Sequence, residues 1–149
     1  MVVEKRVWLI TGTTSYSATK YALEGWSEAL AAEVAPFGIA VTLVEPGAFR
    51  TGFNGPDALV TSTPMHPYAD QMTGLRQMFE DQDGRQPGDP AKAAAAIVSV
   101  VGADQPPLHL VLGEDALDGI AAALDQQRAE LDQWADLTRS TAVVEDVQR

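Results

Sequence analysis

The sequence predicts an α/β fold with a small parallel sheet flanked by helices. Two short runs rich in β-branched residues, 7–11 (VWLIT) and 39–45 (IAVTLVE), stand on either side of a long segment of Ala, Leu, Glu and Lys. Each run stops at a glycine or a Pro-Gly pair, as buried parallel strands do where they reach a turn. Strand, helix and strand in this order predict one βαβ unit with a right-handed crossover.

The remaining elements follow from helix formers and from the residues that interrupt them. The helix between the two strands is predicted over residues 17–35, because Pro36 and Gly38 supply its stop. Residues 47–67 form a loop rich in Gly, Pro, Asn, Ser and Thr, long enough to be a candidate lid. Further helices are predicted over 68–80, 91–101 and 115–138, with Asp89 and Pro90 opening the second of these, and a third strand over 108–112.

Composition limits the classes of function. A chain of 149 residues with 46% hydrophobic residues predicts one domain with one core. The formal charge of −11 disfavours nucleic acid and anionic membrane surfaces as partners. The absence of cysteine excludes disulfides and thiolate chemistry. The first apolar run, of about six residues, is too short for a signal peptide or a membrane span, so we expect a cytoplasmic protein.

Tyr16 and Lys20 are the first candidates for chemistry. They stand four residues apart, so on a helix their side chains lie on one face, one turn apart. A free phenol has a pKa near 10, and proton exchange near neutral pH requires roughly 4 kcal/mol of preferential stabilisation of the phenolate. A neighbouring ammonium group can supply it. Taken alone, this spacing is common by chance and favours a half-buried tyrosine beside a solvated lysine.

The residues around this pair change that interpretation. The stretch YSATKYALEGWSEALAAEVAPFGIAVTLVEPGAFRTGF closely resembles the active-site helix, following strand and Pro-Gly turn of the short-chain dehydrogenase/reductase family. QPGDPAKAAAAIV, PPLHLVLGEDAL and RAELDQWADLTRST resemble the C-terminal helices and last strand of bacterial members, so the resemblance covers residues 16–141. It implies a Rossmann-like fold and a nicotinamide cofactor, NAD or NADP.

The resemblance also implies roles for individual residues. Tyr16 matches the general acid/base for a carbonyl/alcohol couple, and Lys20 matches the lysine that assists its ionisation and hydrogen-bonds the nicotinamide ribose. Pro46 and Gly47 match the turn beside the nicotinamide ring, and Thr51 matches the threonine that helps to hold the carboxamide. Without Tyr16 and Lys20, these three residues would be interpreted as an ordinary strand-ending turn and a loop hydroxyl.

The phosphate-binding half of the family pattern is incomplete. Thr11 and Gly12 resemble the start of its Thr-Gly-x-x-x-Gly-x-Gly loop, but Tyr16 and Ala18 occupy the positions of the second and third glycines. The family's catalytic serine would lie about a dozen residues before the tyrosine, in the region of residues 2–4 (VVE). We therefore interpret residues 1–149 as a single internally truncated domain: a first-strand remnant (1–15), a catalytic and C-terminal segment (16–141) and a tail (142–149).

No metal site is predicted. His66 lies in a loop and is interpreted as exposed, although it could line a substrate lid. His109 falls in the third strand, where a half-buried structural role is expected, and neither histidine has partners spaced as metal ligands.

Three functional hypotheses remain open. The first is an oxidoreductase of the short-chain type with impaired turnover, acting on a small-molecule carbonyl or secondary alcohol. The second is a non-catalytic remnant. It would be a natural truncation, the product of a deletion in the gene model or in the expressed sequence, or a domain retained for subunit association. The third is a chain whose missing half is supplied by another chain. The family's corresponding helix contributes to a subunit interface, and apolar residues spread around this one, which predicts a homo-oligomer: Tyr21, Leu23, Trp26, Leu30 and Val34.

Overall fold

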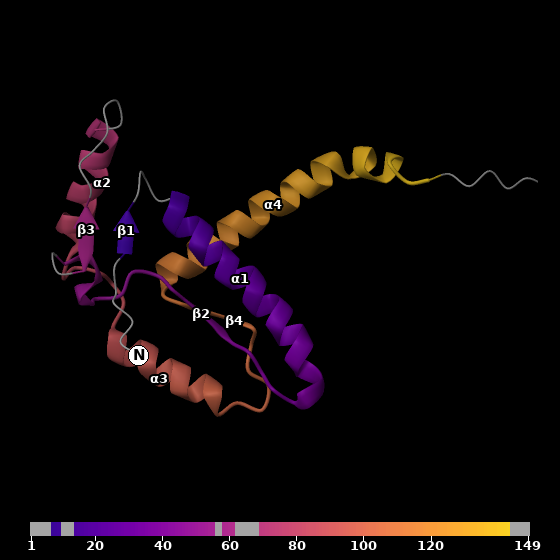
Figure 1. Cartoon of the computed structure of the whole chain (residues 1–149), viewed down its shortest axis with the longest axis horizontal. Helices are drawn as coiled ribbons and strands as arrows, with labels where there is room; N and C mark the ends of the chain where they lie inside the picture. Colours follow the sequence, from indigo (N-terminus) through magenta and orange to yellow (C-terminus); the bar gives the residue numbers. More distant parts are fainter. Residues whose placement is uncertain (1–6, 10–13, 56–57, 62–68, 144–149) are drawn as a thin grey trace, which may run out of the picture.

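The computed structural model describes residues 7–9, 14–55, 58–61 and 69–143. Helices and short parallel strands alternate along these residues, as predicted for an α/β fold (Figure 1). The elements in chain order are β1 (Val7–Leu9), α1 (Thr14–Val34), η1 (Ala35–Phe37), β2 (Leu43–Pro46), η2 (Gly52–Asn54), β3 (Leu59–Thr61), α2 (Ala69–Gln82), α3 (Pro90–Val101), β4 (His109–Leu112) and α4 (Glu114–Ser140).

The four predicted helices are confirmed with small shifts at their ends. α1 begins three residues before the predicted start and continues into the 3-10 turn η1. This turn ends at Gly38, whose φ of 70° lies in the left-handed region that glycine adopts without steric cost. At the start of α3, the Asp89 carboxylate accepts a hydrogen bond of 2.9 Å from Ala91 N, and Pro90 occupies the first helical position.

β2 and β4 form the parallel pair at the centre of the molecule. Their register joins Leu43 to His109 and Pro46 to Leu112. Backbone hydrogen bonds close both ends of the pair, from Leu43 N to Leu108 O (2.6 Å) and from Gly47 N to Leu112 O (2.8 Å). Because the strands are parallel, both carboxyl ends lie at the same edge.

The first strand is not part of this sheet. β1 pairs in parallel with β3, in a second two-stranded sheet whose register joins Val7 to Leu59 and Leu9 to Thr61. The expected single sheet of three strands, and the βαβ unit built from its first two, are therefore wrong for the described residues. A run of β-branched residues identifies a strand, but the pairing partner depends on contacts distant in sequence. β3 itself comes from the segment predicted as a loop.

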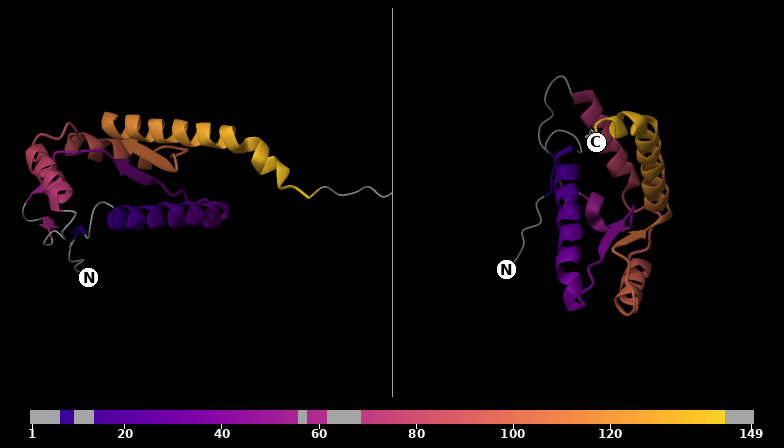
Figure 2. Two further views of the ribbon diagram at one scale, coloured as in Figure 1. Left: turned by 90° about the horizontal axis from the view of Figure 1, so that it is seen from above. Right: turned by 90° about the vertical axis from the view of Figure 1, so that its right-hand side faces the viewer.

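The pair β2–β4 lies between helices. α1 lies on one side of it, and α3 and α4 lie on the other (Figure 2). α4 packs against β4 at its N-terminal end and then extends well beyond the rest of the molecule (Figure 1). The described residues contain no helix with the length and apolar composition that a membrane span requires.

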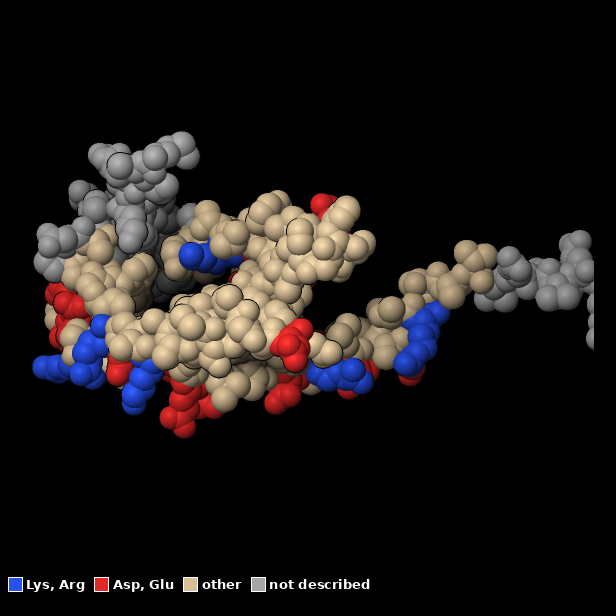
Figure 3. Space-filling model, turned by 90° about the horizontal axis from the view of Figure 1, so that it is seen from below, with Lys and Arg blue, Asp and Glu red and all other residues tan. Residues whose placement is uncertain are grey.

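The described residues do not form the single core that the composition predicts. Among the residues whose side chains are described, Leu43 is the one buried hydrophobic residue, with 8% of its surface exposed. The accessible surface of the chain is 12148 Å², against about 7,400 Å² for a compact monomer of this mass. The face carrying α3 shows few charged side chains (Figure 3), and Val98 and Val101 on this helix are 72% and 79% exposed. Large apolar faces therefore remain uncovered.

Candidate active site

Tyr16 and Lys20 lie on the same face of α1, as their spacing predicts. The Lys20 ammonium nitrogen is 5.4 Å from the centroid of the Tyr16 ring, within the range of a cation–π contact. Tyr16 is 37% exposed, so solvent and small molecules can reach its ring. The first turn of the helix is further fixed by Thr19, whose hydroxyl donates a hydrogen bond of 2.7 Å to the Tyr16 carbonyl.

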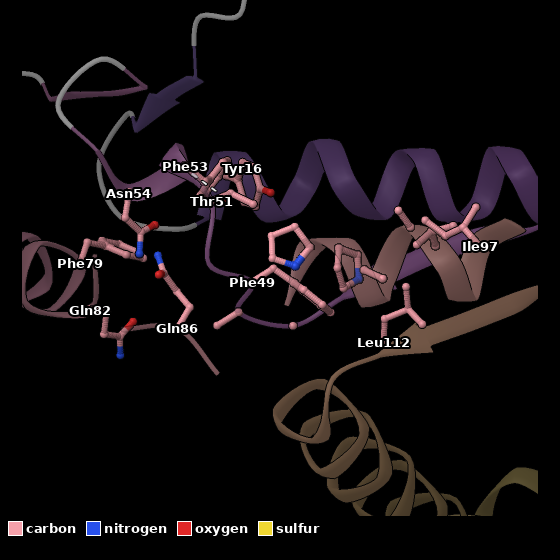
Figure 4. Close-up of a pocket in the computed structure, with 17 residues that line it drawn as sticks. Tyr16, Phe49, Thr51, Phe53, Asn54, Phe79, Gln82, Gln86, Ile97 and Leu112 are labelled. Atoms are coloured by element: carbon pink, nitrogen blue, oxygen red, sulfur yellow. Dashed lines mark hydrogen bonds between the residues drawn. The ribbon is translucent and has the colours of Figure 1, made fainter. Parts of the chain in front are cut away.

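The turn after β2 faces the same space as Tyr16. A cavity of about 590 Å³ is lined by Tyr16, Pro46, Gly47 and Thr51 together with mainly apolar residues. Figure 4 shows Tyr16, Thr51 and Phe53 grouped on one side of this cavity. A second cavity of about 470 Å³ is lined by Tyr16, Lys20 and Pro46. The fold thus gathers these five predicted site residues, from α1 and from residues 46–51, around two adjoining cavities.

Asp115 holds the Pro-Gly turn in place. It lies in the first turn of α4, and its carboxylate accepts a hydrogen bond of 2.6 Å from Ala48 N. A side chain added at Gly47 would overlap this carboxylate, so the close approach of α4 to the turn requires glycine at that position. Sequence reasoning missed this role, because an acidic residue in the first turn of a helix already has a sufficient explanation in the helix dipole.

The chain after the turn is fixed by residues that precede α3. Gly88 N donates to Ala48 O (3.0 Å), and Arg50 N donates to Gly88 O (2.9 Å). The Arg50 guanidinium donates from Nε and Nη2 to the main-chain carbonyl oxygen of Gln86, at 3.2 and 3.0 Å. These bonds join the wall of the larger cavity to the start of α3, so the positions of Thr51 and Gln86 are coupled.

His109 belongs to a cluster that the sequence analysis did not predict. Its Nδ1 lies 2.6 Å from Glu45 Oε1 and 3.9 Å from Glu24 Oε2, and its Nε2 lies 3.8 Å from Glu28 Oε1. The hydrogen bond to Glu45 raises the pKa of His109 above its ordinary value of 6.5, and the three carboxylate charges act in the same direction. Potential ligand atoms of His109, Glu24 and Glu45 lie within 4.8 Å of one another.

Some residues of the sequence analysis lie outside the described residues: Thr11 and Gly12, which resemble the start of the phosphate loop, His66, expected in the loop, and residues 2–4. The roles assigned to the other site residues stay predictions, although their positions around the cavities are now known.

The comparisons with known proteins agree with this geometry. The family model for short chain dehydrogenases matches residues 9–58. An oxidoreductase of Botryotinia fuckeliana, BOA17, is 32% identical over 131 residues, which cover 88% of this chain and 47% of the relative. A 3-ketodihydrosphingosine reductase of Bacteroides thetaiotaomicron is 41% identical over 99 residues, which cover 66% of this chain and 36% of the relative. The crystal structure of a short-chain dehydrogenase from Streptomyces avermitilis superposes with a TM-score of 0.75 at 49% identity. The superposition covers 89% of this chain and 47% of that chain.

Parallel strands flanked by helices, with the likeness to this crystal structure, define a Rossmann-like α/β protein. The chain belongs to the short-chain dehydrogenase/reductase family. It spans about half the length, or less, of the relatives it matches.

The contact between Gly47 and Asp115 gives a first prediction. Gly47→Ala should lower the free energy of unfolding by more than 1 kcal/mol, roughly, because the new methyl group overlaps the Asp115 carboxylate. Asp115→Ala alone should cost about 1 kcal/mol through the lost hydrogen bond to Ala48 N. The double variant should lose less unfolding free energy than the two single variants lose together, because the methyl group at position 47 no longer meets a carboxylate. Urea denaturation measures all three values.

Gly119→Ala on α4 is the matched control for this experiment. A methyl group there meets no atom within 4 Å, so this change should leave stability unchanged or raise it. Strict additivity of the Gly47 and Asp115 changes would contradict the contact.

The His109 cluster gives a second prediction, on pH. A pKa raised in the folded state contributes stability that is complete below the unfolded value of 6.5 and is lost as the pH rises through the folded value. Unfolding free energies measured between about pH 5.5 and pH 9 should therefore fall more steeply for the wild-type chain than for His109→Gln. Glu45→Gln, which removes the main hydrogen-bond partner, should flatten the slope as well. Equal slopes in all three proteins would refute this assignment.

Proposed function

We propose that the chain is an NAD(P)-dependent oxidoreductase of the short-chain type that interconverts a carbonyl compound and a secondary alcohol. The observation that carries the proposal is the cavity shared by Tyr16, Pro46, Gly47 and Thr51, with Lys20 in contact with the Tyr16 ring. The relative from Bacteroides thetaiotaomicron is named as a reductase of a 3-keto compound, which supports a ketone as substrate.

Tyr16 is the general acid and base in this proposal. In the direction of reduction, its hydroxyl donates a proton to the carbonyl oxygen while the carbonyl carbon gains a hydride. In the direction of oxidation, the phenolate takes the proton from the alcohol. The Lys20 ammonium nitrogen lies 5.4 Å from the centroid of the Tyr16 ring, and we assign it the assisting role of the family's lysine.

The residues around Tyr16 fit the nicotinamide end of a dinucleotide. NAD or NADP, when bound, supplies or accepts the hydride. Gly47 lines the cavity beside Tyr16 at the end of β2. The Thr51 hydroxyl accepts a bond of 3.3 Å from Phe53 N and keeps its own hydrogen for an acceptor such as the carboxamide oxygen. Lys20 would hold the nicotinamide ribose, and Gly12 the phosphate side of the cofactor.

Turnover is proposed to be impaired. Tyr16 and Ala18 occupy two glycine positions of the family's phosphate loop, where side chains hinder close approach of the backbone to a pyrophosphate. Residues 2–4 (VVE) offer no hydroxyl at the position of the family's serine. Loss of one such preorganised hydrogen-bond donor typically reduces kcat by a factor of about 100 to 1,000.

A test of this function starts with cofactor binding. The purified chain is titrated with NADH and NADPH, and the nicotinamide fluorescence is followed. We expect saturable binding that Lys20→Ala weakens, because the variant lacks the group proposed to hold the ribose. With a panel of ketones and secondary alcohols, Tyr16→Phe should reduce turnover by a factor of about 100 to 10,000 while cofactor binding is retained.

Lys92→Ala is the matched control for Lys20→Ala, since Lys92 is an exposed lysine on α3 that borders neither cavity. No binding at millimolar cofactor, or equal turnover in the wild-type chain and Tyr16→Phe, would overturn the proposal.

Subunit association is a second candidate function. Three large apolar side chains on α1 are strongly exposed: Tyr21 (75%), Leu23 (49%) and Trp26 (62%). Exposed apolar side chains of this kind mark a candidate interface, and a second copy of the chain can present the same helix to them.

Association through α1 predicts a homo-oligomer in solution. Sedimentation equilibrium should give a mass at least twice that of the 15.9 kDa chain. Trp26→Glu should shift the equilibrium towards monomer, because a carboxylate would be buried in the interface. Trp134→Glu on α4, which is exposed to a similar degree (56%), is the control and should leave it unchanged. A wild-type chain that is monomeric at all concentrations would exclude association.

A further inference from the structure

His109 meets carboxylates that come from two other elements. Glu24 lies on α1, Glu45 on β2 and His109 on β4. The Nδ1 atom of His109 lies 2.6 Å from Glu45 Oε1 and 3.9 Å from Glu24 Oε2. One potential ligand atom of each of these three residues lies within 4.8 Å of the other two. The fold therefore brings an imidazole nitrogen and two carboxylate oxygens to one place.

The separations suit a divalent transition-metal ion. Zinc binds imidazole nitrogen and carboxylate oxygen at about 2.0 to 2.2 Å, so two ligand atoms of a tetrahedral zinc ion lie about 3.4 Å apart. The two distances from His109 Nδ1 bracket this value, so small shifts of the glutamate side chains bring their oxygens into position. The side chains of Glu24, Glu45 and His109 are 35%, 18% and 43% exposed, which lets an ion reach them from solvent.

A third carboxylate occupies the position that a metal-bound imidazole requires. Glu28 Oε1 lies 3.8 Å from Nε2 of His109, the ring nitrogen that faces away from Glu45. Histidines that bind a metal through one nitrogen usually donate the other N–H to a carboxylate or carbonyl, which fixes the tautomer. Within the described residues, His109 is the one cationic partner of these carboxylates. A divalent ion would offset charge that one imidazole leaves unbalanced.

A buried hydroxyl beside the cluster is an independent sign of a ligand. Ser27 precedes Glu28 on α1, and 7% of its surface is exposed. Its hydroxyl forms no hydrogen bond with any residue that the structure describes, and its oxygen is not sealed from solvent. Ser27 lines the cavity of about 470 Å³ that Glu24 and Glu45 also line. Buried hydroxyls nearly always have a partner, and a water molecule bound to a metal ion in this cavity would supply one.

We propose that His109, Glu45 and Glu24 bind a divalent transition-metal ion such as Zn²⁺ between α1 and the β2–β4 pair. The inference goes beyond the oxidoreductase function and does not depend on it. Water completes the coordination and donates a hydrogen bond to Ser27. The ion joins α1 to the strands and so stabilises the folded chain. The sequence gave no sign of this site, because its ligands are distant from one another along the chain and no spacing indicates them.

Calorimetric titration of the purified, metal-free chain with ZnCl₂ tests the proposal. We expect one zinc ion per chain, with a dissociation constant in the micromolar range. His109→Gln and Glu45→Gln should each weaken binding by a factor of about 10 or more, because each removes a ligand. His66→Gln changes the other histidine of the chain and is the matched control, which should keep the wild-type affinity. Excess Mg²⁺ should not displace the zinc, because magnesium prefers oxygen ligands.

Two further measurements identify the ligand atoms and the effect on the fold. In nitrogen-15 NMR of the wild-type chain, one equivalent of zinc should shift the Nδ1 resonance of His109 and leave those of His66 in place. Glu28→Gln should weaken zinc binding by a factor of about 10, whereas Glu33→Gln, an exposed glutamate on the same helix, should not. The melting temperature should rise with zinc concentration and return to its starting value with EDTA, because the ion binds the folded chain.

The contrary results are equally clear. Zinc binding that survives His109→Gln, or several weak sites per chain from which Mg²⁺ displaces zinc, would mean diffuse attraction to an acidic protein and would overturn the proposal. The absence of binding at millimolar zinc would overturn it as well. Should His109→Gln not fold, the NMR titration of the wild-type chain decides alone, and an unshifted Nδ1 resonance of His109 would refute the site. None of these results depends on cofactor binding or turnover.

Discussion

The pairing of β2 with β4 is the interaction on which the rest of the described structure depends. It joins residues more than sixty positions apart and brings the carboxyl ends of two strands to one edge. Pro46 and Gly47 therefore meet the loop that leads into α4, where Asp115 accepts the hydrogen bond from Ala48 N. The same pairing places His109 beside Glu45. Without this register, neither the turn beside Tyr16 nor the histidine cluster would exist.

The helices could be predicted from the sequence because their determinants are local. Asp89 and Pro90 set the start of α3, because the Asp89 carboxylate accepts from Ala91 N and Pro90 fits the first helical position. Gly38 ends the segment that contains α1 through its left-handed backbone. Strand pairing is different, because a run such as residues 7–9 carries no record of its partner. The prediction of a single core was not met among the described residues, for a related reason. Composition measures how much apolar surface is available, whereas burial depends on what lies opposite each face. The described residues leave large apolar side chains on α1 and α3 exposed.

The same division applies to the candidate site. Tyr16 and Lys20 are four residues apart on one helix, so their proximity follows from helical geometry alone. Pro46, Gly47 and Thr51 were found through their family pattern, which is also local. Gln86, Asp115 and His109 gain their importance from residues 36 to 67 positions away, and no spacing in the sequence indicates those contacts.

Because the proposed proton-transfer pair, Tyr16 and Lys20, lies on one helix, its proximity needs little of the rest of the fold. Hydride transfer needs more, since electrostatic stabilisation inside a site depends on the exclusion of water. With Tyr16 37% exposed, the described residues supply the proposed reacting groups without a dry enclosure. Anything that covers these faces, whether cofactor, substrate or a second subunit, binds the folded chain in preference to the unfolded one and stabilises it by mass action. Ligand binding, association and stability of this chain are therefore linked: the folded chain should become more stable as its apolar faces become covered.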